Sequence, residues 1–455
     1  MTAARVEPAP AGLAAEVETL IVGAGAAGLI AALSARDAGR EAVVLERDAA
    51  PAGSTALSAG LIPAAGTKAQ RAAGIEDEPA RFAADIQRKA KYENDLELVD
   101  MMTGAAAEVV DWLEERWGLP FTVVDDFDYP GHSRRRMHGL PTRSGRELVD
   151  RLSAAAASAG ADILCDATVT TLFRDGDRIA GVALTRPDGT EERIGCRRLI
   201  LACNGYGGNR ARVARHMPDI AGALWFGHDG NKGEALDWAE ALGAETRHLS
   251  AYQGHGNVAS PHGILITWAV MTEGGVQLNA EGRRFWDESR GYSEAARAVL
   301  AQPGGHAIAV FDERIAAIAR QFEDFKAAEA QGAVKTAADA AALAAAFDLP
   351  EEPTAETLGG IPWGGVDEFG RRFAARALTP PYRGVRVTGA LFHTQGGLVV
   401  NRATRVLSRG GEAFANLFAV GGAACGVSGS ADDGYLSGNG LLAAATLGRL
   451  AGRAD

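Results

Sequence analysis

A glycine-rich turn near the start of the chain constrains the fold more than any other feature. An apolar run over 18–22 leads into the sequence GAGAAG at 23–28, and a helical pattern and a second apolar run follow, ending at Glu46. Such a turn lets the backbone approach a pyrophosphate, and the amides at the helix start attract the phosphates. A carboxylate about 20 residues further on accepts hydrogen bonds from a ribose 2′-hydroxyl. The order of strand, turn, helix and strand predicts a Rossmann-type dinucleotide site, without deciding between FAD and NAD.

Composition limits the class of protein. The 455 residues suffice for two or three domains, and 47% of them are hydrophobic, which indicates a folded core. The net charge of −12 argues against nucleic acid or an anionic membrane surface as a partner, because either demands a basic patch. No window approaches the roughly 18 consecutive apolar residues of a membrane span, and the start of the chain lacks the pattern of a signal peptide. We therefore expect a cytoplasmic protein without a membrane span.

Three other segments are rich in glycine and small residues. A loop of small and hydroxyl residues occupies 51–60, and a strand with a glycine-rich end occupies 199–209. The stretch 390–453 reads as two strands, a glycine-rich turn and a closing helix. Together with the first turn, these segments resemble the succinate dehydrogenase/fumarate reductase flavoprotein superfamily, which includes the 3-ketosteroid dehydrogenases. The resemblance covers most of the chain, and it is strongest to the ketosteroid dehydrogenase branch.

That resemblance implies an α/β fold, with a Rossmann-type FAD-binding domain that has a glutathione-reductase-like sheet and a β-meander, and with an inserted α+β capping domain. We expect the first part of the FAD-binding domain at 1–235, the substrate capping domain at 236–382 and the second part of the FAD-binding domain at 383–455. The cofactor is expected to be FAD, held non-covalently because Ser54 stands where members with covalent flavin carry a histidine. The residues expected to contact FAD are Gly23, Gly25, Ala26, Ala27, Gly28, Glu46, Arg47, Ser54, Thr55, Ser58, Ala59, Gly60, Val169, Ala202, Asn204, Gly205, Gly421, Asn439, Gly440 and Leu441.

The middle of the chain gives coarser expectations. Alternating apolar residues over 161–201, with Asp-Gly turns between them, predict the β-meander. An apolar helical pattern over 95–118 predicts a helix with two tryptophans in the core. An alanine-rich tract over 327–347 reads as helical and structural, and the arginine run 134–136 reads as a solvated face.

A segment within the expected capping domain is the strongest indicator of chemistry. Residues 275–292 read GVQLNAEGRRFWDESRGY and resemble the family segment that places a proton-transfer residue four positions after a glutamate. That residue is an arginine in fumarate reductases and a tyrosine in ketosteroid dehydrogenases, and here Tyr292 stands four positions after Glu288. A shift of the alignment by two residues would give the role to Arg290 instead.

The start of the closing helix carries a second discriminator. Fumarate reductases have an arginine there that grips a substrate carboxylate in a bidentate manner, whereas this chain has Tyr435, followed by Ser437. A tyrosine hydroxyl can donate to a ketone oxygen instead. The resemblance adds His393, in the pattern HTQGG, as a substrate or flavin contact, with a turn histidine bonded to backbone as the alternative. It also adds Tyr129, in an acidic and aromatic turn over 125–131, with an ordinary surface tyrosine as the alternative.

These residues predict the α,β-dehydrogenation of a cyclic ketone, either a 3-ketosteroid or a smaller alicyclic ketone. Tyr292 removes a proton from Cα while a hydride passes from Cβ to flavin N5, and Tyr435 stabilises the developing enolate as an oxyanion-hole donor would. A tyrosine with its ordinary pKa of about 10 is protonated at neutral pH. Tyr292 therefore needs a neighbour that favours its phenolate, for which Arg290 is a candidate.

Two alternatives stay open. A fumarate-reductase-like enoate reductase would run the same hydride transfer backwards with Arg290 as the proton donor, although Tyr435 in place of an arginine argues against a dicarboxylate. A non-catalytic flavoprotein, such as an electron carrier, would not need tyrosines at proton-transfer positions. The four cysteines have neither metal, haem nor iron–sulfur spacing. An enzyme of this kind would therefore use an external electron acceptor, which is oxygen, a quinone or a redox protein.

Overall fold

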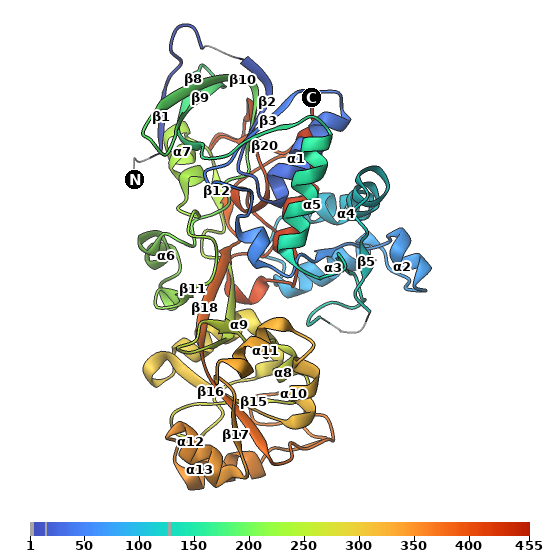
Figure 1. Cartoon of the computed structure of the whole chain (residues 1–455), viewed down its shortest axis with the longest axis vertical. Helices are drawn as coiled ribbons and strands as arrows, with labels where there is room; N and C mark the ends of the chain where they lie inside the picture. The colour runs from blue at the N-terminus through green and yellow to red at the C-terminus, as the bar shows by residue number, and fades with distance from the viewer. Residues whose placement is uncertain (1–3, 14–15, 126–128) are drawn as a thin grey trace. The chain divides into compact units, whose positions relative to one another are not determined.

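The computed structural model describes residues 4–13, 16–125 and 129–455, and its contacts divide the chain into two compact units (Figure 1). The first unit comprises Met1–Arg212, Gly227–Tyr252 and His393–Asp455, and the second unit comprises Val213–Phe226 and Gln253–Phe392. In this division, residues 227–252, which lie on both sides of the boundary expected at 235, all belong to the first unit. Residues 383–392 belong to the second unit.

A nine-stranded sheet forms the centre of the first unit. Its parallel part has the strand order β7-β3-β2-β10-β21. These strands are β2 (Glu16–Val22), β3 (Ala42–Leu45), β7 (Asp162–Leu164), β10 (Glu191–Leu201) and β21 (Ala413–Ala419). All four residues of β3 are buried, as expected for a strand covered on both faces. The predicted Rossmann-type α/β fold is therefore confirmed.

The predicted β-meander extends from the same sheet. It contains β8 (Thr168–Asp175) and β9 (Arg178–Thr185), and β1 (Arg5–Pro8) pairs with β8 in parallel. The strand β10 serves both parts: residues 191–195 pair antiparallel with β9, whereas residues 199–201 pair in parallel with β21. The short strand β20 (Arg405–Leu407) continues the sheet beyond β21. One continuous strand thus couples the meander to the dinucleotide-binding strands.

Helices from distant parts of the sequence pack together in this unit. Helix α1 (Ala26–Asp37) packs against α14 (Asn439–Arg453) and α5 (Gly145–Ser158). A Cβ on Gly452 would lie 2.3 Å from the carbonyl oxygen of Ala31, so the two helices approach closely because α14 has glycine there. The other elements are η1 (Ser54–Leu57), β4 (Ile62–Pro63), α2 (Lys68–Ala72), α3 (Pro79–Lys89), α4 (Leu96–Trp117), β5 (Thr122–Val123), β6 (Met137–Gly139), α7 (Glu234–Leu242), β12 (Thr246–Arg247), β19 (Gly397–Leu398), η5 (Gly421–Ala423) and η6 (Asp432–Gly434).

The second unit is built on a seven-stranded sheet with the order β14-β13-β18-β16-β15, in which β11 and β17 also pair with β18. Its core includes the fully buried side chains of Phe311, Phe325 and Val385. The elements are η2 (Pro218–Ile220), β11 (Leu224–Trp225), β13 (Tyr252–Ala259), β14 (Ile264–Leu265), α8 (Ala269–Thr272), β15 (Val276–Leu278), η3 (Glu288–Arg290), α9 (Tyr292–Leu300), η4 (Pro303–Gly305), β16 (His306–Asp312), α10 (Glu313–Ala319), α11 (Glu323–Ala330), β17 (Lys335–Ala337), α12 (Ala340–Phe347), α13 (Glu351–Gly359) and β18 (Tyr382–Thr394). Helix α6 (Arg210–His216) has residues in both units.

The alanine-rich tract 327–347 is not one helix, contrary to the prediction. Helix α11 ends before Gly332, which adopts φ +74°, and β17 then pairs with β18. Helix α12 begins after Asp339, whose carboxylate accepts a hydrogen bond from the N–H of Ala342 (2.8 Å). The glycine and the N-cap break the tract although alanine favours helix throughout.

Two further predictions about the middle of the chain were wrong. Arg136 is 1% exposed and forms a buried ion pair, so only Arg134 and Arg135 of the arginine run lie on a solvated face. Trp112 and Trp117 are half-buried rather than in the core. The guanidinium of Arg449 lies 4.0 Å from the ring centre of Trp112, so Trp112 packs in the interface between α4 and α14.

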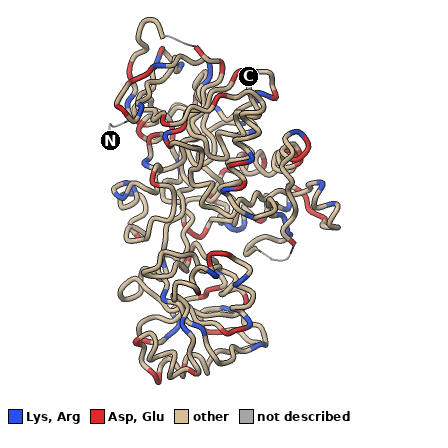
Figure 2. The backbone as a smooth tube through the Cα atoms, viewed as in Figure 1, with Lys and Arg blue, Asp and Glu red and all other residues tan. Residues whose placement is uncertain are grey.

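Figure 2 shows charged residues of both signs interspersed over both units. Many of them form ion pairs, such as Arg320 with Glu329 and Arg186 with Glu192. Within the described residues, no helix is long and apolar enough to span a membrane. The same part of the chain holds no cluster of His, Cys, Asp and Glu side chains suited to a metal ion. All four cysteines are free.

Candidate active site

The glycine-rich turn has the geometry of a phosphate-binding loop. Gly23 adopts φ +108°, and a Cβ built on it would lie 2.5 Å from the carbonyl oxygen of Ala202. A Cβ on Gly28 would lie 1.9 Å from the carbonyl oxygen of Gly23. Neither position accepts a side chain, so the backbone can make the tight turn that leads into α1. The amides of Ala27 and Gly28 in the first turn of α1 are then placed to bind a pyrophosphate, whereas the amide of Ala26 donates to Thr55 Oγ1.

Glu46 directly follows β3 and is 6% exposed. Its Oε2 accepts a hydrogen bond from the N–H of Ala24 (2.7 Å), and its Oε1 accepts one from the N–H of Asp48 (3.1 Å). These bonds hold the carboxylate beside the glycine-rich turn, which is where this fold binds a ribose. The neighbouring Arg47 forms an ion pair with Glu234 of α7 (2.8 Å).

The loop around η1 is fastened to the start of α1. Thr55 Oγ1 accepts a hydrogen bond from the N–H of Ala26 (3.1 Å), and Ser58 Oγ accepts one from the N–H of Gly60 (3.0 Å). Ser54 Oγ accepts a hydrogen bond from Asn231 Nδ2 (2.8 Å). The structure thus brings the predicted cofactor residues of this loop next to the glycine-rich turn. Asn231, which is 4% exposed, was not predicted.

Replacing Gly28 with alanine is expected to abolish stable FAD binding, because the added Cβ meets a backbone oxygen that cannot move away. The purified variant should contain at least about tenfold less flavin per protein than the wild type, measured by absorbance, in line with a steric cost above ~1.4 kcal/mol. Gly104→Ala is the matched control, because a Cβ at Gly104 in α4 meets nothing within 4 Å. A Gly28→Ala protein with full flavin content would show that this turn does not hold the cofactor.

The predicted segment after β10 packs against the C-terminal glycines. Asn204 adopts φ +64°, and its Oδ1 accepts a hydrogen bond from the N–H of Gly205 (2.8 Å). A Cβ on Gly422 would lie 2.1 Å from that oxygen, and a Cβ on Gly421 would lie 2.8 Å from Cβ of Ala27. The segments after β10 and β21 therefore meet at the start of α1. Val169 lies elsewhere, buried within β8 of the meander.

The start of α14 carries a buried polar side chain with an unused acceptor. Gly438 adopts φ +87° and Asn439, the first helical residue, is 1% exposed. Asn439 Nδ2 donates to Ser428 Oγ (3.0 Å), whereas its Oδ1 is buried without a hydrogen-bond partner among the described residues. A buried acceptor of this kind requires a donor, and the isoalloxazine ring supplies an N–H. The residues at this helix start therefore fit FAD.

A chain of hydrogen bonds links Asn439 to His393. Ser428 Oγ donates to Gln395 Oε1 (2.7 Å), and Gln395 Nε2 donates to His393 Nδ1 (2.8 Å). The carbonyl oxygen of Thr394 lies 3.2 Å from the same ring nitrogen. Burial lowers the pKa of His393 to about 4, so the ring is neutral at physiological pH. Gln395 was not predicted, although it occupies the variable position of the HTQGG pattern.

Two of the predicted substrate contacts, Tyr435 and His393, lie together in this unit. Their ring centroids are 5.6 Å apart in an edge-to-face arrangement. Ser437 precedes α14 and is 4% exposed. Tyr129 packs against a buried cluster that contains Met137, and Met137 also lies close to Gly438. Residues 126–128 of the predicted turn around Tyr129 lie outside the described residues.

The second unit holds Tyr292 in an aromatic cluster. Tyr292 is the first residue of α9 and follows Gly291, which adopts φ +139°. The ring of His255 stacks on Tyr292 with 5.1 Å between centroids, and Trp268 meets Tyr292 edge-on at 6.4 Å. Burial lowers the pKa of His255 to about 3, so this ring is neutral as well. His255, which also stacks on Phe392, is a contact that the sequence did not identify.

Glu288 anchors the segment that leads to Tyr292. The carboxylate is 1% exposed and accepts hydrogen bonds from Arg284 Nε (3.0 Å), Arg371 Nη1 (2.9 Å) and the N–H of Gln277 (3.0 Å). Arg284 also pairs with Asp367, whose side chain is 6% exposed, so two guanidinium groups compensate two buried carboxylates and fix η3 to the unit's core. Arg290, at the end of η3, is exposed instead.

Comparisons with known proteins agree with this architecture. A family model described as FAD binding domain matches residues 18–441. A probable fumarate reductase (Ifc3) of Shewanella frigidimarina is 30% identical over 452 residues, covering 97% of this chain and 75% of the relative. The open conformation of a flavocytochrome c3 fumarate reductase superposes with a TM-score of 0.82 at 28% identity, over 97% of this chain and 78% of that one.

A second solved structure has a similar fold. The 3-ketosteroid-Δ4-(5α)-dehydrogenase from Rhodococcus jostii RHA1 superposes with a TM-score of 0.77 at 24% identity, over 98% of this chain and 99% of that one. The family match spans both units and includes the glycine-rich turn and the start of α14. The chain therefore belongs to the FAD binding domain family within the succinate dehydrogenase/fumarate reductase flavoprotein superfamily, and it is an FAD-dependent oxidoreductase that acts on carbon–carbon bonds.

Proposed function

We propose that the protein desaturates a cyclic ketone, which is a 3-ketosteroid or a smaller alicyclic ketone. The observation that carries the proposal is the pair of hydroxyl side chains before α14: Tyr435 is 6% exposed and Ser437 is 4% exposed. The sequence has neither arginine nor lysine between Arg409 and Arg449, so this segment supplies no cation for a carboxylate. Buried hydroxyls without a cation suit a neutral carbonyl oxygen.

The proposed reaction removes two hydrogens from adjacent carbons. Tyr292, as the phenolate, takes the proton from Cα, and Tyr435 donates a hydrogen bond to the carbonyl oxygen on which negative charge develops. Ser437 is a second donor to that oxygen. The neutral ring of His393 contacts Tyr435 without adding a charge that would favour a carboxylate.

FAD, held without a covalent bond, supplies the hydride acceptor at flavin N5 when it is bound. The residues that would hold it are the turn 23–28, Glu46, the hydroxyls of Thr55 and Ser58, and Asn439. The substrate loses H⁺ from Cα and a hydride from Cβ, and a carbon–carbon double bond forms between them. An external acceptor, such as oxygen, a quinone or a redox protein, then takes the two electrons.

One observation favours a second candidate function. The relative and one of the structures described above are named fumarate reductases. An enoate reductase would reverse the hydride transfer and use Arg290 as the proton donor. The exposed position of Arg290 and the hydroxyls before α14 make this the weaker candidate.

Anaerobic bleaching of the flavin by candidate substrates tests the proposal. Purified holoenzyme is mixed separately with a 3-ketosteroid, a cyclohexanone and succinate, and the loss of oxidised-flavin absorbance is recorded. We expect one of the ketones to bleach the flavin and succinate to leave it oxidised. Oxidation of chemically reduced enzyme by fumarate, with no bleaching by either ketone, would contradict the proposal and support the reductase.

A further inference from the structure

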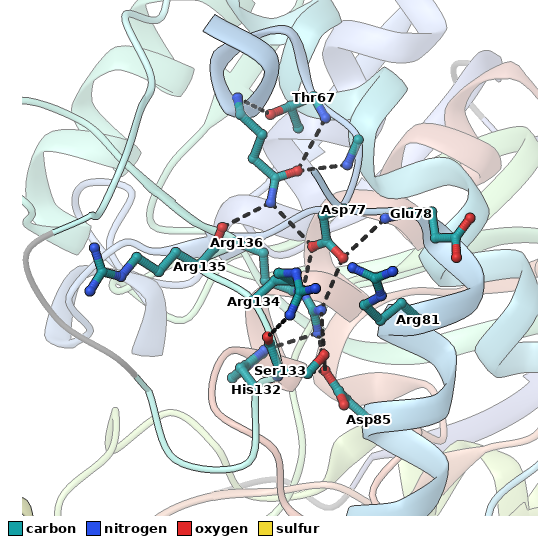
Figure 3. A network of polar contacts seen from close by, with 12 residues as sticks. Thr67, Asp77, Glu78, Arg81, Asp85, His132, Ser133, Arg134, Arg135 and Arg136 are labelled. Atoms are coloured by element: carbon teal, nitrogen blue, oxygen red, sulfur yellow. Dashed lines mark hydrogen bonds and ion pairs between the residues drawn. The ribbon is translucent and has the colours of Figure 1, made fainter. Parts of the chain in front are cut away.

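A buried ion-pair network joins Arg136 to Asp77 and Asp85 (Figure 3). Arg136 binds Asp77 through two parallel bonds, from Nε to Oδ2 (2.8 Å) and from Nη2 to Oδ1 (3.1 Å). Its Nη1 binds Asp85 Oδ2 at 2.7 Å, and the guanidinium lies 4.6 Å from the ring centre of Phe82. The three charged side chains are at most 2% exposed. A fully desolvated arginine with two carboxylates is a rigid support rather than a surface contact.

The network also fixes the segment that precedes Arg136. Asp85 Oδ2 accepts hydrogen bonds from the N–H (2.8 Å) and the Oγ (2.7 Å) of Ser133. Burial opposes the charge of Asp85, but the bonds from Ser133, Arg88 and Arg136 outweigh burial and lower its pKa to about 2. The carboxylate therefore stays ionised, and it holds the backbone at Ser133 next to helix α3.

His132 extends the network to the start of α14. Its Nδ1 lies 3.4 Å from Arg136 Nη1, and its Nε2 lies 2.9 Å from the carbonyl oxygen of Ser437. A guanidinium only donates and a carbonyl only accepts, so Nδ1 must be the acceptor and Nε2 must carry the proton. Burial and the charge of Arg136 lower the pKa of His132 to about 4, which keeps the ring neutral at physiological pH.

We propose that His132 is a positioning residue that holds the Tyr435–Ser437 turn through its hydrogen bond to the Ser437 carbonyl oxygen, with Arg136 as its support. The two partners are 305 residues apart in the sequence, so this bond joins the segment after Tyr129 to the start of α14. The neighbouring Gly131 also packs against this turn, because a Cβ on it would lie 2.7 Å from Leu436 Cδ1. The inference rests on the proposed function, in which Tyr435 and Ser437 contact the carbonyl oxygen.

Three substitutions at His132 separate the hydrogen bond from the shape of the side chain. The amide nitrogen of glutamine reaches about as far as histidine Nε2, whereas that of asparagine reaches only about as far as Nδ1. His132→Asn and His132→Phe should therefore lower the limiting rate of flavin reduction by the ketone about tenfold, with a smaller change in KM, because the misplaced donors act on the developing charge. His132→Gln should retain a rate close to that of the wild type.

His138 provides the matched control. It is buried in β6, its Nε2 lies 2.8 Å from Thr67 Oγ1, and burial lowers its pKa to about 4. His138→Phe thus removes two buried histidine contacts from the same region, the second of them to the Arg136 carbonyl oxygen (2.9 Å), and leaves the bond to the Ser437 carbonyl oxygen in place. We expect its rate per bound flavin to match that of the wild type. Equal slowing by His132→Gln and His132→Asn, or equal slowing by His138→Phe and His132→Phe, would overturn the inference.

Hydrogen exchange of the holoenzyme without substrate separates this inference from the proposed function. Peptides that cover residues 435–442 should exchange about tenfold faster in His132→Asn, and at the wild-type rate in His132→Gln, because the hydrogen bond restrains the local opening of that turn. If no ketone reduces the wild-type flavin but this exchange pattern is observed, the proposed function fails and the positioning role stands. Identical exchange in wild type, His132→Asn and His132→Gln would remove the positioning role.

Discussion

Tyr292→Phe is expected to slow flavin reduction by the ketone substrate about 1,000-fold, because the variant has no hydroxyl to take the proton from Cα and a general base contributes of this order. The substitution keeps the ring that stacks on His255 and meets Trp268 edge-on. It also leaves the Glu288 anchor intact, so the flavin content and the thermal unfolding temperature should not change. Anaerobic stopped-flow measurement of the flavin absorbance gives the rate.

Tyr382→Phe is the control for the loss of a phenol in the same unit. Tyr382 is half-buried in β18, and burial together with Asp312 and Asp339 raises its pKa, so its hydroxyl stays protonated at neutral pH. Its substitution should leave the rate unchanged. If Tyr292→Phe kept the wild-type rate while Arg290→Gln lost it, the proton transfer would belong to Arg290 and the enoate reductase would become the leading function.

Tyr435→Phe is expected to lower the same rate about 100-fold, because removal of one donor to a developing oxyanion costs roughly 3 kcal/mol. The loss should appear mainly in the limiting rate rather than in KM, since the hydrogen bond strengthens as the enolate forms. Ser437→Ala removes the second donor and should have a smaller effect in the same direction. The edge-to-face packing on His393 remains possible with phenylalanine.

Tyr206 supplies a control for a buried tyrosine in the first unit, where its hydroxyl donates to the Leu249 carbonyl oxygen. Tyr206→Phe should lose stability but keep its rate of reduction per bound flavin. Equal rates in Tyr435→Phe and the wild type would show that the carbonyl oxygen is bound elsewhere. The rates of Tyr435→Phe and the wild type can also be compared with each ketone, which distinguishes a steroid substrate from a small cyclic ketone.

The sequence alone was sufficient to predict the parts of the candidate site that consist of contiguous residues. The turn at 23–28, the loop at 54–60 and the start of α14 each contain the small residues on which their local geometry depends, and the structure brings the turn and the loop together at the start of α1. Their spacing along the chain already describes their local geometry. For the same reason the β-meander and the parallel strands could be predicted.

Contacts between distant residues could not be predicted. His255 contacts Tyr292 only because β13 and α9 lie in one folded unit. No sequence pattern around either residue predicts that contact. Arg136 was assigned to a solvated face because its partners Asp77 and Asp85 lie 59 and 51 residues away. A run of arginines has no local feature that distinguishes a buried member from exposed ones.

The packing of α1 against α14 determines when the protein can acquire its cofactor during biosynthesis. Ser34 Oγ donates to the Arg449 carbonyl oxygen (2.7 Å) across 415 residues, and β21 completes the sheet beside β10. On the ribosome, α1, β2 and β10 emerge long before β21 and α14 have been synthesised. The apolar surfaces of α1, β2 and β10 therefore stay exposed until then. The sheet of the second unit, by contrast, is complete once β18 has been made. We therefore expect the second unit to fold first on the nascent chain, and FAD capture to follow only after α14 has left the exit tunnel.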